Sequence, residues 1–66
     1  MNSAEIAIKN GYRIGDTISL YGNAYQITLI TSEEVYGVQV VENGRSVKSD
    51  MVFLLNLKLE GWRLVL

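Results

Sequence analysis

The chain has 66 residues, with 6 Lys+Arg against 7 Asp+Glu for a formal net charge of −1, and it contains no His, Cys or Pro. The missing Cys excludes disulfides, thiolate metal sites and cysteine nucleophiles, and the missing His excludes imidazole ligands and Ser-His-Asp triads. Near-zero charge argues against a protein that grips nucleic acid mainly by electrostatics. A chain this short forms a single domain over residues 1–66.

No targeting or membrane segment is expected. No positive charge precedes the first apolar residues, and Glu5, Lys9 and Asn10 interrupt the stretch that follows, so a signal peptide is not predicted. The densest apolar stretch, residues 51–66, is broken by polar residues, whereas a membrane span needs about 18 uninterrupted apolar residues. We therefore expect a cytoplasmic protein that does not bind a membrane.

Residues 2–10 predict a short helix. Asn2 can accept a hydrogen bond at the N-cap, Glu5 stands three residues on as in a capping box, and Gly11 can take the left-handed conformation that ends helices. The apolar residues of this segment also fit an alternating strand, which remains the alternative. A helix this short forms only when it packs on something else.

A first hairpin is predicted over residues 16–31. Residues 16–21 read as a strand with Ile18 and Leu20 on one side, and Gly22-Asn23 can supply the positive φ values of a two-residue turn. In the second strand, residues 24–31, the residues expected to share one face are Tyr25, Ile27 and Leu29. Ile30 breaks that alternation and indicates a bulge or a bend.

A second hairpin is predicted over residues 35–48. The segment 35–42 is β-branched and aromatic, and Gly37 within it indicates the close approach of another backbone. Asn43-Gly44 is the strongest turn signal, because a type I′ turn requires a positive φ at both central residues. Residues 45–48 then form a fourth strand that pairs with the third.

Residues 49–60 fit two structures. Phe53, Leu55, Leu57 and Leu59 alternate with other residues as in a strand or an extended chain. Ser49-Asp50 resembles an N-cap and Gly61 a helix stop, so a helix remains the alternative. Residues 62–66 read as a closing strand, and its inward-facing residues are expected to be Trp62, Leu64 and Leu66.

Together these elements predict a mainly β fold. Short hairpin-linked strands in so small a chain favour a strongly bent sheet, because a flat sheet would leave one apolar face in water. The expected architecture is a small SH3-like five-stranded barrel with a possible short N-terminal helix.

Residues 15–30 resemble the opening of small SH3-like barrel proteins, many of which are encoded by bacteriophages and other mobile elements. The shared pattern is a Gly-Asp start, an alternating strand, a Gly or Asn-Gly turn and an aromatic-led second strand, and the resemblance covers roughly residues 14–50. It implies a fold more than a function, because this barrel hosts many unrelated roles. Members of such families bind peptides, proteins or nucleic acid, and several short phage proteins inhibit host enzymes.

A second resemblance is to the Sm-like RNA chaperones, which also place a short helix before five strands. Residues 18–22, Ile-Ser-Leu-Tyr-Gly, are one residue short of the first-strand pattern of that family. The Lys-His pair of its bacterial members is absent, which removes the residues that carry RNA contact. This resemblance therefore implies only that several copies of the chain could assemble into a ring.

The C-terminal apolar residues exceed what one small interior can hold. They are Met51, Val52, Phe53, Leu54, Leu55, Leu57 and Leu59. Alternate residues of a strand point opposite ways, and a helix with this run would be apolar nearly all round. A monomer would expose a patch large enough to mark an interface, so we expect a homo-oligomer, either a symmetric dimer or a ring. The competing interpretation is that the N-terminal helix covers this surface within one chain.

These patterns predict a non-enzymatic protein-binding module that occludes the surface of a host protein. We expect it to act as a phage-encoded inhibitor or accessory protein. The residues expected to contact the partner are Tyr36, Phe53, Leu55 and Trp62. The acidic residues stand mainly at turn and cap positions, and no G-x-S-x-G or S-x-x-K pattern occurs. No catalytic residue, metal site or cofactor is therefore predicted.

Nucleic-acid binding is the alternative function. Arg45 and Lys48 flank the predicted Asn43-Gly44 turn, and Arg13 together with the tyrosines could extend a platform for phosphates and stacked bases. Because seven acids compete with six bases, we rank this function below protein binding.

Overall fold

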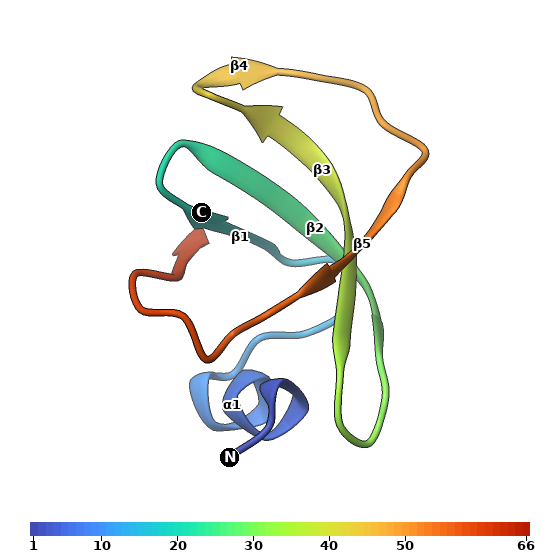
Figure 1. Ribbon diagram of the computed structural model, residues 1–66, viewed down its shortest axis with the longest axis vertical. Coiled ribbons are helices and arrows are strands. Elements are labelled where there is room, and N and C mark those ends of the chain that lie inside the picture. The colour runs from blue at the N-terminus through green and yellow to red at the C-terminus, as the bar shows by residue number, and fades with distance from the viewer.

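The computed structural model describes residues 1–66 and contains one helix and six strands (Figure 1). The elements are α1 (Ser3–Asn10), β1 (Thr17–Leu20), β2 (Asn23–Ile30), β3 (Val35–Glu42), β4 (Arg45–Ser46), β5 (Val52–Leu55) and β6 (Arg63–Val65). The predicted mainly β fold with a short N-terminal helix is confirmed, and β5 brings the strand count to six. No helix here has the length and apolar content needed to cross a bilayer.

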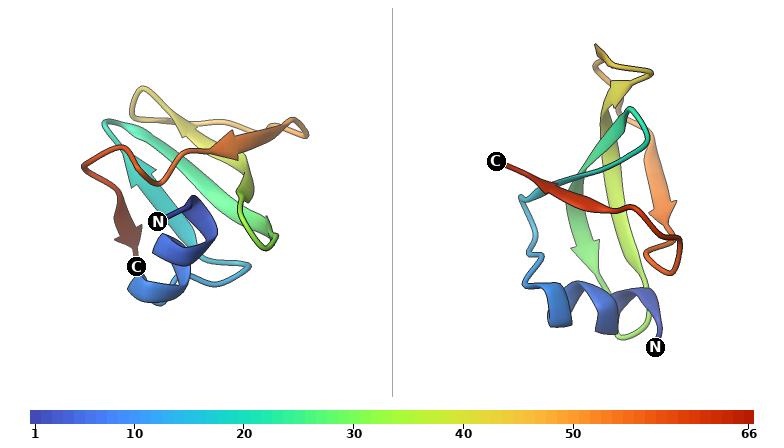
Figure 2. Two further views of the ribbon diagram at one scale, coloured as in Figure 1. Left: turned by 60° about the horizontal axis from the view of Figure 1, so that its bottom comes forward. Right: turned by 90° about the vertical axis from the view of Figure 1, so that its left-hand side faces the viewer.

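All the strands pair antiparallel in one curled sheet of order β4-β3-β2-β1-β6. β5 pairs with β3 on the same side as β4: β5 takes the first half of β3 and β4 takes its end. β5 and β6 do not pair with each other, so the sheet is a half-barrel that stays open between them (Figure 2).

The helix α1 forms as the capping residues predict. The Asn2 side-chain oxygen accepts from the Glu5 N–H at 2.9 Å, and the Glu5 carboxylate accepts from the Asn2 N–H at 2.8 Å. Gly11, with φ 74°, ends the helix in the left-handed region. Ala4 and Ala7 are buried, so α1 packs its small residues against the sheet, and the strand alternative for this segment is wrong.

The turn between β1 and β2 lies one residue earlier than expected. Leu20 pairs with Asn23, and Tyr21 and Gly22 are therefore the turn residues, with φ values of 47° and 85°. Asn23 begins β2 by pairing with Leu20, and its side-chain oxygen accepts from the Asn43 N–H at 3.0 Å, which ties the two hairpin turns together.

A bulge in β2 changes which residues face the core. Ile27 pairs with Gly37 and Leu29 pairs with Tyr36, so Thr28 is the extra residue. As a result Ile27 is buried whereas Leu29 is exposed, and the expectation that they share a face is wrong.

Gly37 confirms the predicted close approach of two backbones. A Cβ at this position would lie 2.6 Å from the Gln26 carbonyl oxygen. The second hairpin also forms as predicted, because Asn43 and Gly44 have φ values of 49° and 81° and Glu42 pairs with Arg45. β4 is shorter than the predicted strand of residues 45–48.

The segment 49–60 is not helical: Val52–Leu55 form β5, and residues 57–60 form a turn. Pairing with β3 turns Leu55 inward, and Leu57 continues into the core beyond the end of the strand. The Leu57 N–H donates to the Ser3 hydroxyl at 3.0 Å, a buried bond between α1 and the C-terminal region. The core cluster consists of Ala7, Ile18, Ile27, Val35, Leu55 and Leu57.

The closing strand is present, but its predicted inward face is wrong in part. Trp62 packs against the core, whereas Leu64 and Leu66 are exposed. No layer of the half-barrel covers them, because the sheet is open beyond β6.

Candidate functional site

The free edge of β5, here called the β5 edge, is the first feature of the candidate site. β5 pairs with β3 on one side only. None of the backbone hydrogen bonds outside the regular elements involves Val52–Leu55. In an antiparallel strand, N–H and C=O groups point alternately to the two sides, so those on the outer side have no partner within the chain. The right-hand view of Figure 2 shows β5 at the margin of the sheet.

The three free edges of the sheet differ in chemistry. β4 has two residues and carries Arg45, and β6 has three residues and carries Arg63. β5 has four residues, Val-Phe-Leu-Leu, with no charge and no bulge in its pairing with β3. Natural sheets protect their edges with charged residues, bulges or very short strands, and β5 contains neither a charged residue nor a bulge. The β5 edge is therefore the unprotected one.

An apolar patch adjoins the β5 edge on the outer face of the sheet. The residues of this outer patch are Leu29, Tyr36 and Leu54, which form one row across β2, β3 and β5, and Val38 and Val52, which form a second row whose β2 member is the polar Gln26. Directly paired residues lie on the same face of a sheet. Val52 and Leu54 are 57% and 59% exposed. The outer patch therefore runs up to the β5 edge without a polar border.

Tyr36 is held in the outer patch by a hydrogen bond. Its hydroxyl donates to the Glu34 carboxylate at 2.9 Å. This hydrogen bond, with some burial and the nearby negative charge, raises the pKa of Tyr36 above its ordinary value of 10.0. The phenol therefore stays neutral at physiological pH, and its oxygen is anchored at one end of the patch.

On the other face of β5, three aromatic side chains form an apolar groove. The ring of Tyr25 lies 5.6 Å from that of Phe53 and 5.9 Å from that of Trp62, centroid to centroid, within the range of favourable aromatic pairs. The Trp62 indole N–H donates to the Asn56 carbonyl at 2.9 Å, which fixes the indole. We call this feature the aromatic groove; its other lining residues include Leu20 and Leu59.

The size of the aromatic groove limits what it can hold. Its volume is about 190 Å³. Pockets for drug-sized ligands usually measure about 300–1,000 Å³. A groove this small and mostly apolar suits one or two apolar side chains of a peptide segment.

The structure brings most of the predicted partner-binding residues to β5. Phe53 and Trp62 line the aromatic groove, and Tyr36 lies in the outer patch. Leu55 is only 3% exposed and belongs to the core, so it is not available to a partner. The exposed neighbour Leu54 takes its place, because the register with β3 turns Leu55 inward and Leu54 outward.

Sequence reasoning missed the outer patch as a unit. Val52, Leu54 and Leu29 become neighbours only through the pairing of β5 and β2 with β3. The apolar run of residues 51–55 was the signal, but it does not say which alternate residues face outward.

The three predicted nucleic-acid contacts do not form one surface. Arg45 and Lys48 lie in or next to β4, at the end of the molecule opposite α1 (Figure 1). Arg13 follows α1 by three residues, and its backbone N–H donates to the Asp16 carboxylate at 2.9 Å. This separation gives no basis for a joint phosphate-binding site of the three cations.

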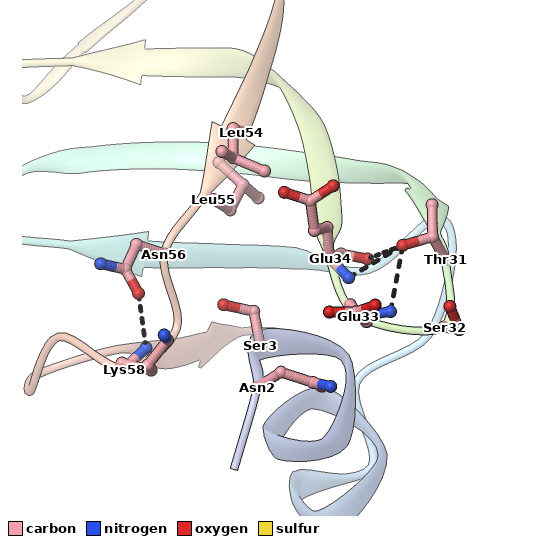
Figure 3. Close-up of a pocket in the computed structure, with 10 residues that line it drawn as sticks. All are labelled: Asn2, Ser3, Thr31, Ser32, Glu33, Glu34, Leu54, Leu55, Asn56 and Lys58. Carbon is pink, nitrogen blue, oxygen red and sulfur yellow. Dashed lines mark hydrogen bonds between the residues drawn. The ribbon is translucent and has the colours of Figure 1, made fainter.

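A second, polar groove of about 680 Å³ lies between the start of α1, the β2–β3 turn and the segment after β5 (Figure 3). Its polar groups build local structure. The Thr31 hydroxyl accepts from the N–H groups of Glu33 and Glu34 at 3.2 and 2.8 Å, and the Asn56 side chain accepts from the Lys58 N–H at 3.1 Å. No group of three His, Cys, Asp or Glu residues in the structure could hold a metal ion.

Tyr36 therefore lies on the outer face beside β5, and Phe53 and Trp62 lie on the opposite face. The resemblance to SH3-like barrels of phage type stays a prediction. Comparison with known proteins finds no matching family model, no matching characterised protein and no matching solved structure.

Proposed function

We propose that this protein is a non-enzymatic protein-binding module that binds an extended segment of a partner as an added strand on the β5 edge. The observation that carries the proposal is the unprotected β5 edge with apolar surface on both sides of it. Adding a strand to an exposed sheet edge is a common mode of peptide recognition, in which main-chain bonds give affinity and side-chain pockets give specificity.

An added strand would use both apolar surfaces at once. Alternate side chains of a strand point to opposite faces. One set would continue the outer patch beside Val52 and Leu54, and the other set would reach the aromatic groove beside Phe53. The preferred partner segment is therefore one whose residues are apolar on both faces.

The aromatic groove supplies the anchoring contacts. Interfaces draw much of their binding energy from a few aromatic side chains in well-packed positions. Tyr25, Phe53 and Trp62 are packed on one another and the Trp62 indole is hydrogen-bonded, so these rings lose little freedom when a partner covers them.

Strand addition is also a mode of occlusion. A partner segment bound along β5 has its own backbone edge covered. A small protein that acts in this way serves as an inhibitor or accessory subunit of a larger one, as the resemblance to phage barrel proteins implies.

A peptide titration followed through Trp62 tests the proposal. Trp62 is the only tryptophan in the chain, so its fluorescence reports on the aromatic groove. The probe is a lysine-flanked synthetic peptide carrying Val-Phe-Leu-Leu. We expect saturable binding that changes little between about 50 and 200 mM salt, unlike binding to phosphates.

The matched control is the same peptide with alternate backbone amides methylated. It keeps every side chain and loses the donors that an added strand needs. Equal binding of the two peptides, or no fluorescence change with either when the chain is monomeric, would contradict strand addition.

A further inference from the structure

We infer that the partner on the β5 edge is β5 of a second copy of this chain, which gives a two-fold symmetric dimer. This inference rests on the proposed function and names its partner. β5 is itself a strand that is apolar on both faces and free along one edge, which is the chemistry that the β5 edge requires.

The strand is complementary to itself in an antiparallel register. A two-fold axis perpendicular to the sheet keeps opposed residues on the same face, so a residue can oppose itself or one that is an even number of positions away. With Phe53 opposite the partner's Phe53, Val52 lies opposite the partner's Leu54 and every opposed pair is apolar. With Leu54 opposite itself, Val52 would instead oppose the polar Asn56. We therefore assign the register centred on Phe53.

The chain also exposes more surface than a compact monomer of its mass, which is consistent with a surface that a second copy covers. A compact monomer of 7.4 kDa has an accessible surface of about 4,200 Å². This chain exposes 4622 Å². The difference, about 400 Å², is half of the roughly 800 Å² that each partner contributes to a standard interface. Self-pairing joins the two outer patches and covers part of the Val52 and Leu54 side chains, which contribute to the large accessible surface of the monomer.

Analytical ultracentrifugation over a range of concentrations tests the dimer. We expect a species of twice 7.4 kDa. Leu54→Lys places a charge on the β5 edge and is expected to weaken dimerisation by at least about tenfold, or about 1.4 kcal/mol. Val65→Lys is the matched control, because Val65 is an exposed residue of a different free edge, that of β6, and this variant should still dimerise. Circular dichroism checks that both variants keep the fold.

Disulfide trapping tests the register. The chain has no cysteine, so single substitutions give clean probes. Directly opposed residues of antiparallel strands lie about 4.5–5.5 Å apart between Cα atoms, within disulfide reach, whereas diagonal pairs at about 7–8 Å are outside it. An oxidised mixture of Val52→Cys and Leu54→Cys chains should therefore form mixed dimers, while either variant alone should form few.

The outcomes separate the two proposals. A wild-type chain that stays monomeric or a Leu54→Lys variant that dimerises normally would overturn the self-paired dimer and leave the peptide titration to decide the proposed function. Cross-links confined to like variants would overturn the register centred on Phe53. Failure of the peptide to bind to a monomeric chain would overturn strand addition itself.

Discussion

The two central hairpins and the C-terminal third reach their places in the sheet by different means. In the hairpins, the pairs Tyr21-Gly22 and Asn43-Gly44 take positive φ values and set the pairing of strands that are adjacent in sequence. β5 and β6 instead pair with β3 and β1, which lie far away in the sequence. Local turn chemistry therefore organises the first region, and tertiary packing organises the second.

The difference shows in where apolar side chains lie. The hairpin strands bury Ile18, Ile27 and Val35 almost completely. The C-terminal third buries Leu55 and Leu57 and leaves most of its other large apolar residues exposed. A region placed by long-range pairing thus supplies both part of the core and the surface proposed for binding.

Leu57→Ala should have the largest effect, because it removes a core residue of the C-terminal third. Leu57 is 4% exposed, and truncating a buried leucine typically costs about 3 kcal/mol of unfolding free energy. Leu59, two residues on, is 54% exposed, and Leu59→Ala should cost less than about 1 kcal/mol. Urea unfolding of both variants measures the difference. Equal losses of unfolding free energy in the two variants would contradict the assignment of Leu57 to the core and Leu59 to the surface.

Gly37→Ala should cost about 2 kcal/mol through a different mechanism in the hairpin region. The new Cβ would lie 2.6 Å from the Gln26 carbonyl oxygen, so the β2–β3 pairing must shift. Gly44→Ala meets no atom within 4 Å and is strained only by its φ of 81°, so it should cost about 1 kcal/mol. Thermal or urea unfolding ranks the two, and the reverse order would sink the close-approach explanation.

Ser3→Ala should cost about 1–2 kcal/mol, because it leaves the buried Leu57 N–H without an acceptor. This substitution tests how firmly α1 is tied to the C-terminal third. Ser32→Ala, at an exposed position in the β2–β3 turn, is the control and should be nearly neutral. A neutral Ser3→Ala result in urea unfolding would show that the bond adds no stability.

Glu34→Gln should have the smallest effect and is best measured by pH titration. It removes the carboxylate that accepts from the Tyr36 hydroxyl, so the pKa of Tyr36 should fall toward its ordinary value of 10.0. Because the pKa of Tyr36 is raised in the folded state, the bond stabilises the fold fully below about pH 10 and is lost as the pH rises through the raised pKa. Difference absorbance of tyrosinate follows the titration, and an unchanged midpoint would contradict this cause.

The sequence predicts the elements whose signals are local. The cap residues Asn2 and Gly11 predicted α1, and Asn43-Gly44 predicted the second hairpin turn. The bulge at Thr28 could not be placed from the sequence, because it depends on how β2 fits β3. That Leu54 faces outward could not be predicted either, because it depends on the register of β5 with β3. Part of the candidate site was predictable from aromatic residues such as Phe53 and Trp62, but its geometry depends on pairings across the chain.

The hydrogen bond between Ser3 and Leu57 has a consequence for biosynthesis. The acceptor belongs to the first turn of α1, and the donor lies 54 residues later. During translation α1 emerges first, but its docking partner does not yet exist, and a helix of this length is unstable by itself. Final closure of the fold must therefore wait until Leu57 has left the ribosome, and until then the core residues Ile18, Ile27 and Val35, which emerge earlier, are accessible to chaperones.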